Sequence, residues 1–308
     1  MSALSQTDIA LLETIAEMRN GTAPGAYNIR KDSGCASRVN TEAVVITTKT
    51  DKPGIDVTFA PGCKETCHIP VIITKSGLRE TVFNDFFVGE GADVLIIAGC
   101  GIHNCGEDAS EHDGIHTFHI GKNARVRYVE KHYGEGDGRG KNIMNPGTVA
   151  YLEEGASLQM DTSQIAGIDS TRRDTKVVCA AGAEVVITER LLTHGEQRAD
   201  SDMEIVLDGE DSRGRVISRS VAQDTSEQVF RPRVVGNAKC FGHVQCDSII
   251  MGHARIRSVP EIAANDLDAQ LIHEAAIGRI AGDQLLKLQT LGLTPEEAED
   301  RILKGFLA

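Results

Sequence analysis

The chain has 308 residues, of which 32 are basic and 45 are acidic, so its formal net charge is −13. This balance argues against a nucleic-acid surface, which needs clustered Lys and Arg. Aromatic residues make up only 4% of the chain, whereas there are 31 glycines. That composition indicates many turns and aliphatic strands rather than a large aromatic core.

The sequence also indicates where in the cell the protein would be located. No apolar run approaches the roughly 20 residues of a transmembrane helix, and the first eight residues lack the basic region and apolar core of a signal peptide. We therefore expect a cytoplasmic protein with no membrane partner. In that compartment the eight cysteines would stay reduced, so a disulfide framework is the less favoured interpretation.

The first predicted element is an amphipathic helix over residues 5–20. Ser5 and Asp8 have the spacing of a capping box, and Asn20-Gly21 is a stop signal. We expect residues 1–39 to form this helix and a connector. Its apolar face would contain Ile9, Leu12, Ile15 and Ala16.

A weak internal repeat follows in the middle of the chain. A small residue comes after a turn residue at positions 92, 124, 156 and 183, with looser echoes at 214, 238 and 254. A turn followed by period-two alternation predicts a strand, and a recurrence near 30 residues predicts stacked coils. We therefore expect a β-solenoid core over residues 40–262. A β-sandwich with similar turns is the alternative.

The last predicted elements are helices. Pro260 and the polar run 263–266 indicate a change from strand to helix, and residues 267–278 have one apolar helical face. A second short helix would end at Gly292. We expect residues 263–308 to form a helical segment. Its final helix would begin at Thr294, with Pro295 at the first helical position and Glu297 closing a capping box.

Three residues near the end of the chain are candidate metal ligands. Cys246 lies in a strand-like segment, and a thiolate is a soft iron ligand, although a buried core residue is the usual role of a free cysteine. His273 and Glu274 are adjacent, so on a helix they would point about 100° apart. A solvated Glu and a capping or core His is the alternative interpretation of that pair.

A second group of candidate ligands lies in the middle of the chain. Cys100, His103 and Cys105 form a Cys-x2-His-x-Cys spacing that could clasp one metal. A structural or incidental role is equally compatible with this pattern, and a transient iron or sulfur path is a third possibility. Other thiols and imidazoles nearby in the sequence are Cys63, Cys67, His68, His112, His116 and His119.

Nucleophilic catalysis and ATP hydrolysis find little support. The sequence contains no Gly-x-Ser-x-Gly elbow and no Ser/His/Asp grouping with a recognisable context. The glycine-rich run 134–141 fails the phosphate-loop template, because Glu135 stands where the first glycine is needed and Asn142 replaces Ser or Thr. We expect a surface loop there, and a protein that is not an enzyme.

The end of the chain resembles the C-terminal signature of the SufB/SufD family, the scaffold subunits of the SUF iron–sulfur cluster assembly machinery. The matching residues, in order, are Gln245-Cys246-Asp247-Ser248, Gln270-Leu271-Ile272-His273-Glu274-Ala275 and Gly278-Arg279-Ile280. The resemblance implies a right-handed parallel β-helix and a non-enzymatic scaffold that carries a transient iron–sulfur cluster built from iron and sulfide donors.

The resemblance also implies roles and partners. Cys246 matches the family cysteine implicated in cluster assembly, Glu274 matches the ligand of SufB-type subunits, and His273 matches the ligand of SufD-type subunits. Since one chain has both the SufB-like Glu274 and the SufD-like His273, the resemblance implies a homodimer. In it, Cys246 of one subunit would face the His273–Glu274 pair of the other. An ABC ATPase of the SufC type would dock on residues 266–308. The chain resembles the short type found in minimal systems.

Two other functions remain open at this point. One is a structural subunit that binds the ATPase without a cluster of its own, which would have no need of Cys246 and Glu274. The other is a carbohydrate-active β-helix enzyme, which needs paired carboxylates and usually aromatic platforms. The scarcity of aromatic residues argues against the enzyme.

Overall fold

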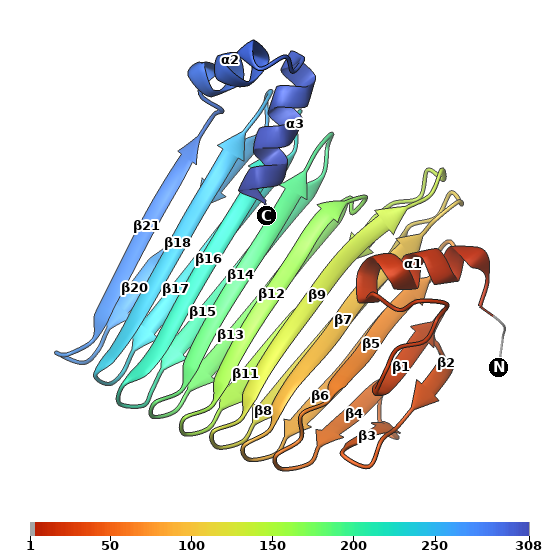
Figure 1. Cartoon of the computed structure of the whole chain (residues 1–308), viewed down its shortest axis with the longest axis vertical. Coiled ribbons are helices and arrows are strands. Elements are labelled where there is room, and N and C mark those ends of the chain that lie inside the picture. Colours follow the sequence, from red (N-terminus) through yellow and green to blue (C-terminus); the bar gives the residue numbers. More distant parts are fainter. Residues whose placement is uncertain (1–3, 308) are drawn as a thin grey trace.

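The computed structural model describes residues 4–307 and shows a β-solenoid of about 8 turns with three helices (Figure 1). Nearly all strand pairs one coil apart are parallel, and the two antiparallel pairs lie at the N-terminal end. The predicted solenoid is therefore confirmed. None of the helices in this part of the chain is long and apolar enough to cross a membrane.

The coils stack into two long sheets. The first sheet has the order β2-β1-β5-β7-β9-β12-β14-β16-β18-β21. Its strands are β1 (Ala26–Lys31), β2 (Gly34–Val39), β5 (Thr66–Ile73), β7 (Asp93–His103), β9 (Arg125–Glu135), β12 (Ser157–Ala166), β14 (Glu184–Thr193), β16 (Ser212–Ala222), β18 (Cys240–Ile250) and β21 (Gln270–Gly278).

The second sheet has the order β19-β17-β15-β13-β10-β8-β6-β4-β3, with β11 and β20 beside this path. Its strands are β3 (Val44–Thr48), β4 (Gly54–Phe59), β6 (Arg79–Val88), β8 (Ser110–Ile120), β10 (Asn142–Met144), β11 (Gly147–Leu152), β13 (Ser170–Cys179), β15 (Arg198–Leu207), β17 (Glu227–Gly236), β19 (Arg255–Ser258) and β20 (Glu261–Ala264).

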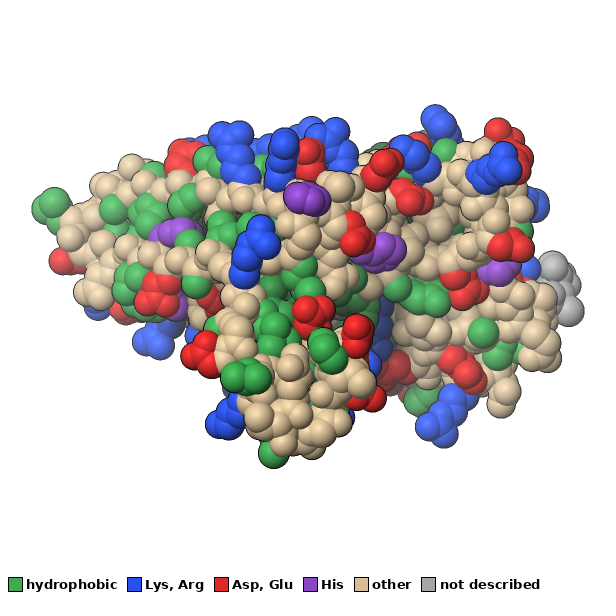
Figure 2. Space-filling view, turned by 90° about the horizontal axis from the view of Figure 1, so that it is seen from above, with side chains coloured by type: hydrophobic (Ala, Val, Ile, Leu, Met, Phe, Trp, Pro, Cys, Tyr) green, Lys and Arg blue, Asp and Glu red, His purple; other side chains and the backbone are tan. Residues whose placement is uncertain are grey.

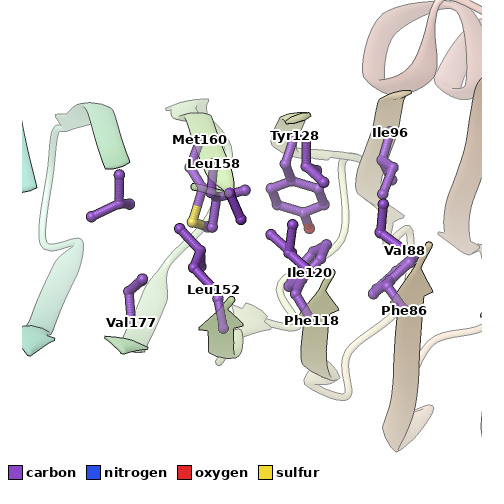
Figure 3. Packing of buried hydrophobic residues seen from close by; sticks show 14 of the residues in the cluster. Phe86, Val88, Ile96, Phe118, Ile120, Tyr128, Leu152, Leu158, Met160 and Val177 are labelled. Carbon is purple, nitrogen blue, oxygen red and sulfur yellow. The ribbon is translucent and has the colours of Figure 1, made fainter. Parts of the chain in front are cut away.

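Strands one coil apart pair residue for residue, so equivalent side chains form rows along the solenoid. Leu158, for example, lies between Val126 and Val185. Alternate residues of both sheets point inward and meet in one core (Figure 3). Phe86 and Phe118, on neighbouring coils, stack with their ring centroids 4.5 Å apart.

The internal repeat corresponds to a recurring tight turn before β7, β9, β12 and β14 of the first sheet. At positions 92, 124, 156 and 183 the small residue is a fully buried alanine, and a residue with positive φ precedes each one. The next coil has Ser212 after Asp211 (φ 58°), and Cys240 is its partner one coil later. The looser echoes at 214 and 238 were therefore placed two residues away from the equivalent position, and Ala254 belongs to a turn of the second sheet.

Helix α1 (Gln6–Ala16) begins at the predicted capping box of Ser5 and Asp8 and ends at Glu17, which is left-handed. It lies across β5, β7 and β9 (Figure 1). The approach is close, because a Cβ on Gly99 would lie 2.4 Å from the Ile15 carbonyl oxygen. Residues 26–39 form β1 and β2, so the prediction of a connector up to residue 39 is wrong there.

The change from strand to helix comes later than predicted. Residues 261–264 and 270–278 form β20 and β21, and β21 pairs with β18 over nine residues. This backbone pairing outweighs the helical pattern of the segment. Helices α2 (Gly282–Thr290) and α3 (Pro295–Phe306) follow, and α3 has the predicted capping box at Thr294.

Candidate functional site

Cys246 and His273 meet at the C-terminal end of the solenoid. β21 is the last strand of the first sheet, and it places His273 opposite Val244 of β18, on the same inward face as Cys246. The Cys246 Sγ lies 3.6 Å from the His273 Nε2. The thiol is 2% exposed, whereas the imidazole on the last strand is partly exposed. One chain therefore brings these two candidate ligands together without a second subunit.

Glu274 faces the opposite side of the sheet. Adjacent residues of a strand point to opposite faces, so the 100° separation expected on a helix is wrong. Its carboxylate lies 3.5 Å from the Nε2 of His243 and is largely exposed. Of the three predicted ligands, the structure brings two together and places the third outside.

Burial sets the protonation of the inward pair. It raises the pKa of Cys246 to about 11. Burial also lowers the pKa of His273, and the nearby His243 lowers it further. At neutral pH the pair is therefore a thiol and a neutral imidazole. A metal that binds the sulfur must displace its proton, so we expect binding to release protons.

Cys246 ends a row of inward polar side chains in the first sheet. Going from β9 to β18, the residues in register are Glu130, Thr162, Glu189, Ser218 and Cys246. The Ser218 hydroxyl donates to Glu189, 3.3 Å away. The row therefore joins the thiol at the end of the solenoid to buried carboxylates in its middle.

Those carboxylates are held by the buried guanidinium of Arg173. Arg173 Nη1 donates to Glu130 Oε2 at 2.7 Å, and Arg173 Nε lies 3.6 Å from Glu189. Burial raises the pKa of Glu130, but His132 and Arg173 more than offset that effect and hold it well below its usual range. The Tyr128 hydroxyl donates to the other Glu130 oxygen. These charges are therefore paired and hydrogen-bonded, as buried charges must be.

The comparison with known families decides the classification. Residues 77–306 match the model of the SufBD core domain of SUF system FeS cluster assembly. The chain belongs to the SufBD family. The resemblance proposed from the C-terminal signature is thereby confirmed, and with it a link to iron–sulfur cluster assembly.

Relatives of this SufBD chain include archaeal proteins named as iron–sulfur cluster assembly SufBD family proteins. One from Methanothermobacter thermautotrophicus is 26% identical and covers 96% of this chain and 74% of the relative. One from Methanocaldococcus jannaschii is 26% identical, with coverages of 79% and 77%. One from Pyrococcus horikoshii is 29% identical, with coverages of 76% and 71%.

The second predicted site of this SufBD chain is divided between two faces of β7. Cys100 is buried in the interior beside Ile102 and Met144, and burial raises its pKa well above the usual value. His103 lies at the other face, three residues further along the strand. Cys105 follows in an exposed loop and contacts His103. The structure therefore does not bring the three together as one clasp.

The remaining thiols and imidazoles of the mid-chain group are also dispersed. Among residues 4–307, no three His, Cys, Asp or Glu side chains form a group that could hold a metal ion. His112 and His116 are buried in the interior, and His119 is exposed between the rings of Phe87 and Tyr151. Cys63, Cys67 and His68 are buried near the N-terminal end.

Sequence reasoning missed one arrangement of this SufBD chain. His103 Nδ1 lies 2.9 Å from an oxygen of Glu135, and the same imidazole contacts Cys105. In the sequence, Glu135 stands out only as a residue of the glycine-rich run. The spacing of the two residues could have revealed this contact. Residues 103 and 135 are 32 positions apart, which equals the nearby repeat steps, so they occupy equivalent positions on successive coils.

Proposed function

We propose that this chain is a scaffold on which iron and sulfide assemble into a cluster, with Cys246 and His273 as ligands and the cluster as cargo. The observation that carries the proposal is the 3.6 Å approach of the thiol and the imidazole on the inward face at the end of the solenoid. Thiolate and imidazole are both iron ligands, and the thiolate is the softer of the two. A purely structural subunit would have no need of this pair.

The ligand set suits a protein that must release what it builds. One thiolate and one imidazole hold a cluster less firmly than the four thiolates of a permanent site. Glu274 can reach the same cluster only from a second subunit or after a shift of β21, because its carboxylate faces outward. We therefore expect Glu274 to contribute less than Cys246.

The final coil supports a homodimer joined at this end. β21 and the β19–β20 pair are the last strands of their sheets, and an uncovered solenoid end needs a cap or a partner. Figure 2 shows hydrophobic side chains at the left end of the molecule, where β21 lies in Figure 1. Exposed hydrophobic residues of the last coil are Val259, Ile262, Leu267, Ile272 and Ile277.

The two C-terminal helices are the proposed dock for an ABC ATPase of the SufC type. Ala298 and Leu303 of α3 are buried, while Leu286 of α2 and Leu291 after it are 62% and 75% exposed. The chain has no phosphate-loop match of its own. We therefore assign ATP hydrolysis to the partner and no enzymatic activity to this chain.

The boundary of β21 defines how the dock is tested. Deleting residues 279–308 removes both helices and leaves β21 with His273 in place, whereas a cut at residue 266 would also remove the candidate site. The deletion should abolish co-purification with the ATPase and leave the β-rich circular dichroism intact. Unchanged binding would refute the assignment.

Anaerobic reconstitution with ferrous iron and sulfide tests the scaffold function. Absorption and Mössbauer spectra should show a cluster on the wild type, a nearly complete loss in Cys246→Ser and a partial loss in Glu274→Ala. Cys240→Ser is the matched control, because Cys240 lies on the inward face of the same strand. Wild-type cluster content in Cys246→Ser would show that the chain lacks the proposed role.

A further inference from the structure

The N-terminal end of the solenoid contains a cavity of about 570 Å³ that is lined by residues of both sheets. One wall is the antiparallel pair of β1 and β2, and the other is the turn between β3 and β4 with the start of β6 (Figure 1). Its floor is apolar and includes the buried residues Ile55, Ile69, Val71 and Val82. A cavity of this size with such a floor can hold a small organic molecule.

A β-bulge forms the polar wall of this N-terminal cavity. β1 pairs Asn28 with Arg38 of β2, and after a register shift at Ala36 it pairs Arg30 with Cys35. Opposed residues of an antiparallel pair share a face, so the bulge turns Cys35 and Arg38 to the same side of the strand. The paired residues on both sides of the bulge therefore all line the cavity.

Most of the positive charge in the lining is neutralised within the protein. The cations of the lining are Arg30, Arg38, Lys49, Lys52 and Arg79. Three of them have carboxylate partners, in the pairs Arg30–Glu80, Lys49–Asp85 and Arg79–Glu111. Burial raises the pKa of Glu80, but His112 and Arg30 more than offset that effect and lower it to about 2. Glu80 therefore stays an anion that is bound to Arg30.

Arg38 and Lys52 are held by neutral groups instead. Arg38 Nε donates to the side-chain oxygen of buried Asn28 at 2.8 Å, and Lys52 Nζ lies 4.7 Å from the ring centroid of Phe83. In the part of the chain that the structure describes, neither cation has a carboxylate at ion-pair distance. Asp85 is close enough to feel the charge of Lys52, but it already has its own ion pair. Both cations therefore keep their charge available for a ligand.

We propose that this cavity binds a small organic phosphate monoester, with its phosphate on Arg38 and Lys52 and its apolar body on the floor. Two cations without carboxylate partners match a phosphate monoester, which carries a charge of about −1.5 to −2 at neutral pH. The guanidinium edge that Asn28 leaves free suits two phosphate oxygens, and the ammonium adds a point charge. The site is independent of Cys246 and His273, which lie at the other end of the solenoid.

A series of probes with one apolar body tests the charge requirement on the full-length protein. The probes are 1-naphthyl phosphate, naphthalene-1-sulfonate and 1-naphthol, which are a dianion, a monoanion and a neutral molecule at slightly alkaline pH. In isothermal titration, the phosphate should bind at least about tenfold more tightly than the sulfonate, and the naphthol should show no binding. Equal affinity for the phosphate and the sulfonate would overturn the proposal.

Substitutions test the two cations. Arg38→Gln should weaken the binding of 1-naphthyl phosphate about tenfold or more, and Lys52→Gln should weaken it less, because Lys52 is exposed to solvent. Arg125→Gln is the matched control, since Arg125 is an exposed arginine of β9 outside the cavity. Its affinity should equal that of the wild type. Wild-type affinity in Arg38→Gln, or an equal loss in Arg125→Gln, would overturn the proposal.

Cys35 provides a measurement that needs no substitution. It is exposed and lines the cavity, whereas Cys105 is exposed in a loop outside it. At about ten times its dissociation constant, 1-naphthyl phosphate should slow the alkylation of Cys35 by N-ethylmaleimide about tenfold in the wild type. Peptide mass spectrometry should show Cys105 alkylated at an unchanged rate. An unprotected Cys35, or equal protection of both thiols, would place the probe elsewhere and contradict the site.

Discussion

The buried charges in the middle of the solenoid and the thiol–imidazole pair at its end differ in how completely they are bonded. Glu130 and Arg173 are both buried, and each has several close polar partners within 3.6 Å. Cys246 and His273 have one contact with each other, at 3.6 Å. The first group has little capacity left for a ligand, whereas the second keeps its donor atoms available at the uncovered end.

Replacing one member of each group should give the largest contrast. Arg173→Met leaves Glu130 buried without the guanidinium that donates to it at 2.7 Å, so we expect it to lower the free energy of unfolding by about 3–5 kcal/mol. His273→Ala removes a partly exposed side chain at an edge and should cost about 1 kcal/mol or less. Urea unfolding followed by circular dichroism measures both. Equal decreases in the free energy of unfolding would show that the two groups contribute equally to stability.

The pH dependence of stability sharpens the same comparison. His116 is buried in the middle region, and burial lowers its pKa from 6.5 to about 4. The unfolded chain takes up this proton at a higher pH than the folded one, so acidification from about pH 6.5 to 4 removes stability. At 1.36 kcal/mol per pKa unit the loss reaches about 3 kcal/mol.

His116→Gln should flatten the unfolding free energy between those pH values, whatever its cost at neutral pH. His119→Gln is the control, because His119 is exposed on the outer face of the same strand. In His119→Gln, the change of the unfolding free energy with pH should match that of the wild type. If the unfolding free energy of His116→Gln still falls with pH as in the wild type, another group governs the loss of stability in acid.

The smallest expected effect on stability concerns the two ends of the solenoid. Val45 on β3 and Ile277 on β21 are 42% and 43% exposed, at opposite ends. Changing either to lysine should alter the free energy of unfolding of the monomer by about 0.5 kcal/mol or less. In light scattering, only Ile277→Lys should convert the proposed dimer to a monomer. A strict monomer in the wild type, with and without the ATPase, would contradict the dimer itself.

Local chemistry explains what the sequence could predict. The capping boxes at Ser5 and Thr294 each depend on four consecutive residues, and both form as predicted. The solenoid was predicted because each coil repeats a turn that buries a small residue, as at Ala92 and Ala124. These signals need no knowledge of distant parts of the chain.

Errors arose where a distant strand decides the outcome. β21 has a hydrophobic pattern compatible with a helix, and its pairing with β18 makes it a strand. That change reversed the relation between His273 and Glu274, which now face opposite sides. The contact of His103 with Glu135 was missed for a similar reason, because it joins two successive coils.

Pulsed EPR on the reduced, reconstituted cluster tests the central claim most directly. With ¹⁵N-labelled histidine, the wild type should show a hyperfine coupling from a nitrogen bound to iron. His273→Gln should lose that coupling, whereas His243→Gln should keep it, since His243 faces outward beside Glu274. A coupling that persists in His273→Gln, or that disappears only in His243→Gln, would contradict a cluster held on the inward face at the end of the solenoid.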